Sequence, residues 1–343
     1  MRHVYVFSRD FFRESFLSHT DGLNTGGNDA NFEGSFCGSF PFFVSSRIDK
    51  KILHGGFIMK KILSLCLSLL FGASAAALSA CSEDGISVAV PNDATNEARA
   101  LLLLEDLGYI ALDADAGITA TPRDIVDNPY GLRFVEMEAG QIPRALQDVD
   151  YAVINSNYAL DAGIDPVNDS LAVESAEDNP YSNILAVRAG NENSPAILAL
   201  VAALSSQQVA DFIETEYSGA VISSVSAPGT GFDDSIDYAA LAGTTIRVAA
   251  TPTPHAEILA VAAEILEERS ITLQIIEYTD YVQPNNAVND GAVDANYFQH
   301  LPYLEDFNAS NGTNIVSVLA VHLEPLGLYG GKQSSLDGIT AGK

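Results

Sequence analysis

From residue 86 onward, short apolar runs alternate with longer amphipathic stretches. Apolar runs rich in Val, Ile and Tyr have the length of strands, whereas apolar positions that recur every three or four residues indicate helices. The predicted strands are residues 86–90, 133–138, 151–154, 183–188, 245–250, 273–278, 292–298 and 314–321. The predicted helices are residues 95–107, 144–148, 195–217, 256–268 and 284–290. Because strands and helices alternate, we expect an α/β fold with largely parallel sheets.

Several residues at the ends of these elements support the assignment. Gly108 follows the first helix and Gly291 follows the last, which is the usual position of glycine just beyond a helix. Thr253 and Pro254 are predicted to be the N-cap and first-turn residues of the helix 256–268. Residues 195–217 are predicted to form one long amphipathic helix.

Residues 226–243 break the alternation. They are rich in Gly, Pro, Ser and Asp and show neither period. We interpret them as a linker that separates a larger front part from a back part.

The N-terminal region has the pattern of an export signal. Lys60 and Lys61 precede an apolar stretch, residues 62–78, and the small residues after it end at Cys81. A cysteine at this position is typical of a bacterial lipoprotein, in which the thiol carries lipid. The alternative is an uncleaved anchor helix. Met59 is the expected start of the signal 59–80, and residues 1–58 are interpreted as a non-native or disordered leader rather than a domain.

The charge and the cysteine content limit the classes of function that fit this chain. The chain has a formal net charge of −28, and from Cys81 onward 39 acidic residues face nine Lys and Arg. Such a surface would repel nucleic acid and anionic lipid. We interpret it as resembling proteins from high-salt environments rather than as a site for a cationic ligand. The other cysteines are Cys37 and Cys66, so once Cys81 is lipidated the exported part has no thiol for a disulfide.

Several motifs resemble those of one protein family, the NlpA-type methionine-binding lipoproteins of ABC importers. The motifs are Tyr281-Val282-Gln283-Pro284-Asn285-Asn286-Ala287, Asp294-Ala295-Asn296-Tyr297-Phe298-Gln299-His300-Leu301-Pro302-Tyr303-Leu304, Val90-Pro91-Asn92-Asp93-Ala94-Thr95-Asn96, Arg99-Ala100-Leu101-Leu102-Leu103-Leu104, Asp124-Ile125-Val126-Asp127-Asn128-Pro129, Ile154-Asn155 and Asn179-Pro180-Tyr181 with Asn183. Together they cover nearly all of residues 86–343.

The order of these motifs differs from the order in that family. There, the block that resembles residues 244–343 comes first, and the block that resembles residues 86–225 follows. The chain therefore resembles a circularly permuted member, in which residues 226–243 join the old ends; a rearranged gene is the alternative. Surface termini that lie close together make such a change physically tolerable.

The resemblance implies a periplasmic-binding-protein-like fold of two α/β lobes that close on a ligand at a hinge. Lobe one would be residues 183–326, including the linker, and lobe two residues 86–172 with 332–343. The crossings would lie near Gly327–Gly331 and Val173–Pro180. The implied function is capture of methionine in the cleft and delivery to an ABC permease and its ATPase, on the extracytoplasmic face of the membrane, with the lipid on Cys81 as anchor.

The resemblance also implies the residues that bind the ligand. Arg99 would hold a carboxylate through two parallel hydrogen bonds, and the amide oxygens of Asn155 and Asn183 would accept from an ammonium group. The aromatic side chains of Tyr281, Phe298, His300 and Tyr303 would enclose a thioether. His300 is expected to be neutral.

The sequence offers no catalytic motif such as a nucleophile elbow, a Walker loop or a dinucleotide-binding glycine pattern. His255 and His322 lack the neighbouring ligands of a zinc site, and His255 is expected to be structural or at the rim of the cleft. We expect no enzyme activity, no cofactor and no metal. The alternatives are a binding protein for another small amino acid or peptide, a surface lipoprotein that does not transport, and an enzyme on the same scaffold.

Overall fold

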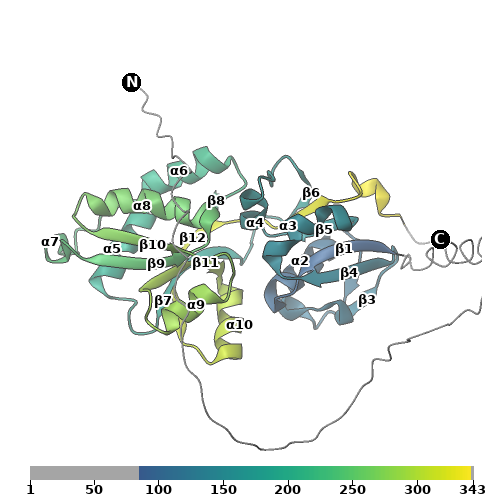
Figure 1. Ribbon diagram of the computed structural model, residues 1–343, viewed down its shortest axis with the longest axis horizontal. Helices are drawn as coiled ribbons and strands as arrows, with labels where there is room; N and C mark the ends of the chain where they lie inside the picture. Colours follow the sequence, from purple (N-terminus) through teal and green to yellow (C-terminus); the bar gives the residue numbers. More distant parts are fainter. Residues whose placement is uncertain (1–84, 341–343) are drawn as a thin grey trace, which may run out of the picture. The chain divides into compact units, whose positions relative to one another are not determined.

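The computed structural model describes residues 85–340, which lie in one compact unit, Cys81–Lys343. The leader, the signal and Cys81 lie outside the described residues. Two β-sheets organise the described part, and each is covered by helices on both faces (Figure 1). We call the part around one sheet lobe two, residues 86–173 and 327–339, and the part around the other lobe one, residues 182–323.

The sheet of lobe two has five strands in the order β4-β1-β5-β13-β6. Alternate residues of its strands face opposite sides. Val88 and Val153 pack with helix α2, whereas Ala89 and Ile154 pack with α3 and α4. The elements are β1 Ile86–Pro91, α2 Ala94–Asp106, β4 Leu132–Met137, α3 Ile142–Ala145, β5 Tyr151–Ile154, α4 Ser156–Asp161, β6 Ser170–Val173 and β13 Gly327–Gly330, with a separate pair of β2 Ala111–Leu112 and β3 Ile125–Asp127.

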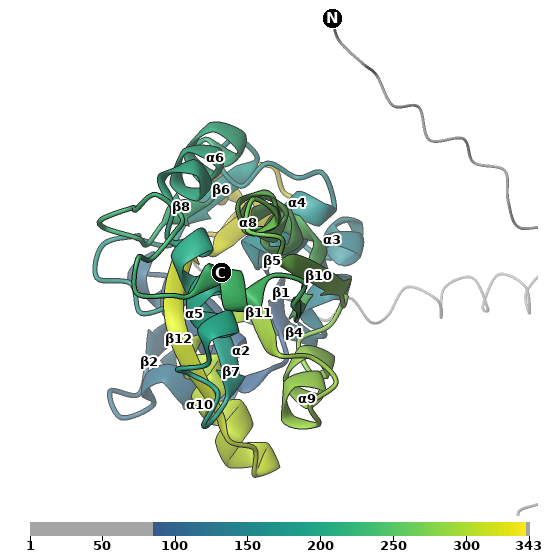
Figure 2. The ribbon, with the colours of Figure 1, turned by 90° about the vertical axis from the view of Figure 1, so that its left-hand side faces the viewer.

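The sheet of lobe one has six strands in the order β10-β9-β11-β7-β12-β8. Leu185 and Val187 on β7 face the helices α5, α6 and α8, and Ile184 and Ala186 face α9 and α10 on the other side (Figure 2). The elements are β7 Ser182–Arg188, α5 Pro195–Leu204, α6 Gln207–Tyr217, β8 Ile222–Ser223, α7 Tyr238–Leu241, β9 Thr245–Ala250, α8 Glu257–Glu267, β10 Thr272–Glu277, α9 Gln283–Asn289, β11 Ala295–His300, α10 Leu301–Asn311 and β12 Ile315–Leu323. None of the described helices has the length and apolar character needed to cross a membrane.

The predicted strands are confirmed to within a few residues, but the expectation of largely parallel sheets is wrong. β1 with β4 and β5, and β9 with β10 and β11, are parallel pairs. The strands next to the lobe crossings, β6, β7, β12 and β13, make antiparallel pairs. Where the chain crosses from one sheet to the other, the crossing strand runs opposite to the strands of the local strand–helix units. The spacing of apolar residues along the chain does not reveal this reversal.

Two predicted helix features are also wrong. Residues 195–217 form two helices instead of one, because Ser206 caps α6 by accepting a hydrogen bond from the Val209 amide. Thr253 is not an N-cap, since α8 begins at Glu257 after a turn over Pro252–Ala256. Its hydroxyl donates to the Glu257 carboxylate at 3.0 Å.

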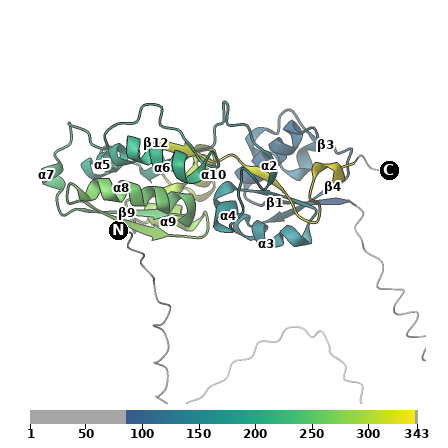
Figure 3. The same cartoon turned by 90° about the horizontal axis from the view of Figure 1, so that it is seen from above.

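The segment 226–243 packs on lobe one instead of forming a linker without contacts. Phe232, Ile236 and Leu241 contact the hydrophobic core of that lobe. The Arg269 guanidinium lies 4.1 Å from the centre of the Phe232 ring. This segment runs over the lobe-one helices (Figure 3).

Two short segments connect the lobes, residues 174–181 and 324–326. They are joined to each other, because the Glu174 amide donates to the Leu326 carbonyl at 2.9 Å. The crossings lie close to the expected positions near Val173–Pro180 and Gly327–Gly331, but the second comes a few residues earlier, since Gly327–Gly330 is strand β13, paired with β5 inside lobe two. Gly331 is needed for packing, because a Cβ there would lie 2.2 Å from the Leu146 carbonyl oxygen.

Candidate ligand-binding pocket

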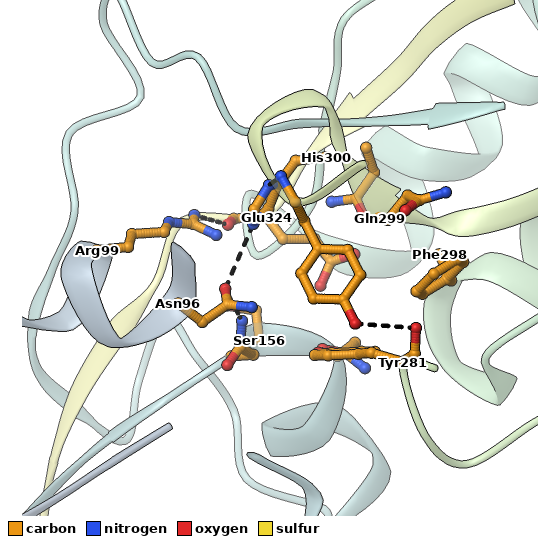
Figure 4. A pocket seen from close by; sticks show the side chains of 12 residues that line it. Asn96, Arg99, Ser156, Tyr281, Phe298, Gln299, His300 and Glu324 are labelled. Carbon is orange, nitrogen blue, oxygen red and sulfur yellow. Dashed lines mark hydrogen bonds between the residues drawn. The ribbon is translucent and has the colours of Figure 1, made fainter. Parts of the chain in front are cut away.

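A small cavity, with about 20 Å³ of space for the centres of water-sized molecules, lies between residues of the two lobes. All seven residues expected to bind the ligand line it, and sequence reasoning missed five others (Figure 4). The expected residues are Arg99, Asn155, Asn183, Tyr281, Phe298, His300 and Tyr303; the others are Asn96, Ser156, Asn157, Gln299 and Glu324. Asn96 and Gln299 stand inside the family-like motifs, and Ser156 and Asn157 directly follow Asn155, so these motifs could have nominated them.

Arg99 is the cation of the pocket and is fixed by both lobe crossings. It is 3 % exposed, on α2. Its Nε donates to Glu174 Oε1 at 2.9 Å, and its Nη2 donates to Glu174 Oε2 at 2.5 Å and to the Glu324 carbonyl at 2.8 Å. The guanidinium lies 4.5 Å from the centre of the Tyr181 ring. Among residues 85–340, Nη1 has no hydrogen-bond partner, which leaves this nitrogen for a ligand.

Asn155 follows β5 and has an orphaned acceptor. Its Nδ2 donates to Asn96 Oδ1 at 2.8 Å, which fixes the amide, and Asp93 holds Asn96 in turn at the start of α2. Oδ1 of Asn155 is buried and has no partner in the described part of the chain. A buried polar atom without a partner costs about 1–3 kcal/mol, so this oxygen is suited to a donor from a ligand.

Asn157 has the complementary property. Tyr281, from lobe one, donates its hydroxyl to Asn157 Oδ1 at 2.7 Å. Nδ2 of Asn157 is buried and has no partner within residues 85–340. The pocket wall therefore carries one unused acceptor and one unused donor.

The remaining wall is aromatic. The rings of Tyr281, Phe298 and Tyr303 are 5.9–6.1 Å apart between centres. The Tyr303 hydroxyl donates to the Tyr281 carbonyl at 3.0 Å. Rings in this arrangement enclose an apolar or sulfur-containing side chain.

His300 connects this wall to the polar side. Its Nδ1 accepts from the Tyr303 amide at 3.1 Å, so Nε2 carries the proton and faces Asn96 Oδ1 at 3.3 Å. Burial and the nearby Arg99 lower the pKa of His300 well below its usual value. The imidazole is therefore neutral, as expected from the sequence.

The Asn183 side chain already has a hydrogen-bond partner within the protein, which the sequence did not predict. Its Oδ1 lies 3.0 Å from Nε2 of His255, which is fully buried instead of lying at the cleft rim. One lone pair of this oxygen is thus used, and the second remains.

His255, His322 and Glu324 are spaced closely enough to hold a metal ion. Their facing atoms already bond one another at 2.7 and 3.3 Å, so these contacts alone account for the arrangement, and the absence of a metal stays a prediction.

The family follows from comparison with known proteins. A family model described as NlpA lipoprotein matches residues 70–225 and 246–343, which together make up more than half of the chain. The chain belongs to the NlpA lipoprotein family. Proteins similar to this chain include "Outer membrane lipoprotein 3" of Mannheimia haemolytica, 44 % identical over 140 residues, 41 % of this chain and 53 % of that protein.

Another relative is the "Probable D-methionine-binding lipoprotein MetQ" of Vibrio cholerae, 40 % identical over 140 residues, 41 % of this chain and 52 % of the relative. The chain spans about half the length of these curated relatives. A solved structure of a nutrient-binding protein from Burkholderia cenocepacia bound to methionine is 46 % identical, with a TM-score of 0.40, and the match covers 42 % of this chain and 61 % of that one.

Proposed function

We propose that this protein is the solute-binding component of an ABC importer and captures methionine, or a similar small amino acid, between its two lobes. The observation that carries the proposal is the pair of unused polar atoms beside Arg99. A zwitterionic amino acid needs a cation and a donor for its carboxylate and an acceptor for its ammonium group, and the pocket has all three.

The ligand would be oriented by these groups. Its carboxylate would lie against Nη1 of Arg99 and Nδ2 of Asn157, and its ammonium group against Oδ1 of Asn155. Its side chain would face Tyr281 and Phe298. The names of the V. cholerae relative and of the B. cenocepacia complex support methionine as the ligand.

The rest of the function follows from the family and the N-terminal pattern. Lipid on Cys81 would anchor the protein on the extracytoplasmic face of the membrane, where an ABC permease and its ATPase would receive the ligand. A binding role without catalysis fits a pocket whose polar groups are suited to holding a ligand.

Removal of Arg99 tests the binding mode. Arg99→Ala should weaken methionine binding about 30-fold or more in calorimetric titration, because a buried carboxylate would lose its paired cation. Arg247→Ala is the matched control, since Arg247 pairs with Asp294 at 2.9 Å on the surface and should leave affinity unchanged. A folded Arg99→Ala protein with unaltered affinity would reject the proposed orientation.

We also propose that the chain is a circularly permuted family member. Two observations support this: the family matches in two stretches on either side of residues 226–245, and each curated relative aligns along only about half its length. Ile86 and Ile339 pack in one core cluster, so the two ends of the described chain can be joined. A chain that begins at residue 244, continues from 343 into 86 and ends at 225 should fold and bind the same ligand. Aggregation of that protein would contradict the proposal.

A further inference from the structure

Glu324 is a buried carboxylate at the pocket wall that the binding mode above does not use. It is 5 % exposed and borders the pocket (Figure 4). Its Oε1 lies 2.7 Å from His322 Nε2 and 3.3 Å from His255 Nε2. On the far side of each ring, Nδ1 faces a hydroxyl: that of Tyr297 for His322, and that of Thr251, at 2.8 Å, for His255. A hydroxyl can donate to Nδ1, and only a protonated Nε2 can donate to a carboxylate. His322 therefore gives Glu324 a hydrogen bond, whereas Nε2 of His255 donates to Asn183 Oδ1 at 3.0 Å and lies 3.3 Å from the carboxylate.

Neither histidine brings a positive charge to Glu324. Burial lowers the pKa of both His255 and His322 to about 3, so both rings are neutral at physiological pH. Arg99 donates only to the main-chain carbonyl of Glu324 and pairs its charge with Glu174. Burial raises the pKa of Glu324, and the nearby Arg99 and the Asn157 backbone amide offset this rise only in part.

We propose that the Glu324 carboxylate is the counter-charge for the α-ammonium group of the ligand. It acts beside Asn155 and makes the pocket selective for ligands with a free ammonium group over isosteric hydroxy acids. This inference rests on the proposed function, because it assumes an amino acid in the pocket. The neutral His322 fixes the carboxylate by its hydrogen bond without satisfying its charge, so the ligand itself supplies the cation.

The first test uses the wild-type protein, purified, unfolded and refolded to remove any retained ligand. Calorimetric titration compares methionine with 2-hydroxy-4-(methylthio)butanoate, in which a hydroxyl replaces the ammonium group. We expect the hydroxy acid to bind about 10- to 100-fold more weakly, the range for loss of a charged hydrogen bond. Equal affinity for the two ligands would overturn the inference.

The second test assigns the effect to Glu324. Glu324→Gln keeps the shape and should weaken methionine binding about 10- to 100-fold but hydroxy-acid binding by less than about threefold. Glu174→Gln is the matched control at the carboxylate that pairs with Arg99: it acts through Arg99 on the ligand carboxylate and should affect both ligands by the same factor. The melting temperatures of both ligand-free variants show whether they fold.

The outcomes separate the two proposals. A wild-type protein that binds methionine, with a Glu324→Gln penalty equal for both ligands, overturns the role of Glu324 alone. A folded wild-type protein that binds no amino acid overturns the proposed function as well.

Discussion

The hydrogen bond between Tyr281 and Asn157 joins the two lobes at the pocket. Tyr281 belongs to lobe one and Asn157 to α4 of lobe two, and the hydroxyl lies 2.7 Å from the amide oxygen. This bond also turns Nδ2 of Asn157 into the position where it is buried and unused. Tyr281→Phe removes the hydroxyl and keeps the aromatic wall.

The loss of ligand affinity expected for Tyr281→Phe can be calculated from this one hydrogen bond. A hydrogen bond between neutral groups contributes about 0.5–1.5 kcal/mol, which corresponds to about a two- to 13-fold rise in Kd. Because the bond crosses between the lobes, the rise should come mainly from faster dissociation of the ligand. The melting temperature of the ligand-free protein should change little if the lobes separate without ligand.

Stopped-flow and calorimetric measurements with methionine would test this expectation. Tyr303→Phe is the control, because its hydroxyl donates to the Tyr281 carbonyl at 3.0 Å and both residues belong to lobe one. It should change the dissociation rate by less than Tyr281→Phe does. Equal effects of the two substitutions, or an unchanged dissociation rate for Tyr281→Phe, would refute the argument that this bond holds the lobes together.

Two further predictions concern stability. Burial, with Glu136 and Asp93 nearby, raises the pKa of Glu97 to about 7, so this group loses its stabilising contribution as pH rises from about 4.5 through 7. Glu97→Gln should therefore gain stability relative to the wild type over that range, by at most about 3 kcal/mol in urea unfolding, and a pH-independent difference would contradict this. Gly331→Ala would place a Cβ 2.2 and 2.4 Å from two backbone carbonyl oxygens and should cost about 3 kcal/mol. Gly229→Ala, with no atom within 4 Å, should cost less than about 0.5 kcal/mol in the same assay; similar losses at both glycines would disprove the packing argument.

The sequence allowed most strands and the seven expected pocket residues to be predicted. Strand ends carry Asn155, Asn183 and His300, and the ends of buried strands converge on the cleft, so motif and position agree. The direction of the strands at the crossings could not be predicted, because apolar period does not encode whether a neighbour is parallel.

The importance of Glu324 could not be predicted either. An acidic residue before a proline, Pro325, is ordinary in a chain with 45 Asp and Glu. Its meaning comes from His255, which is distant in the sequence, and from His322, two residues before it; both come close to its carboxylate only in the folded protein. The break at Ser206 was missed for a related reason, since a serine in an apolar helical pattern is read as part of the helix unless its capping bond is known.

Binding of an amino acid in the cleft is the central claim. Calorimetric titration of the refolded protein in high salt with L-methionine and D-methionine, with leucine and glutamine as controls, tests it most directly. The account predicts tight one-to-one binding of at least one methionine enantiomer and weaker binding of leucine and glutamine. A well-folded protein that gives no heat of binding with any of the four would contradict it.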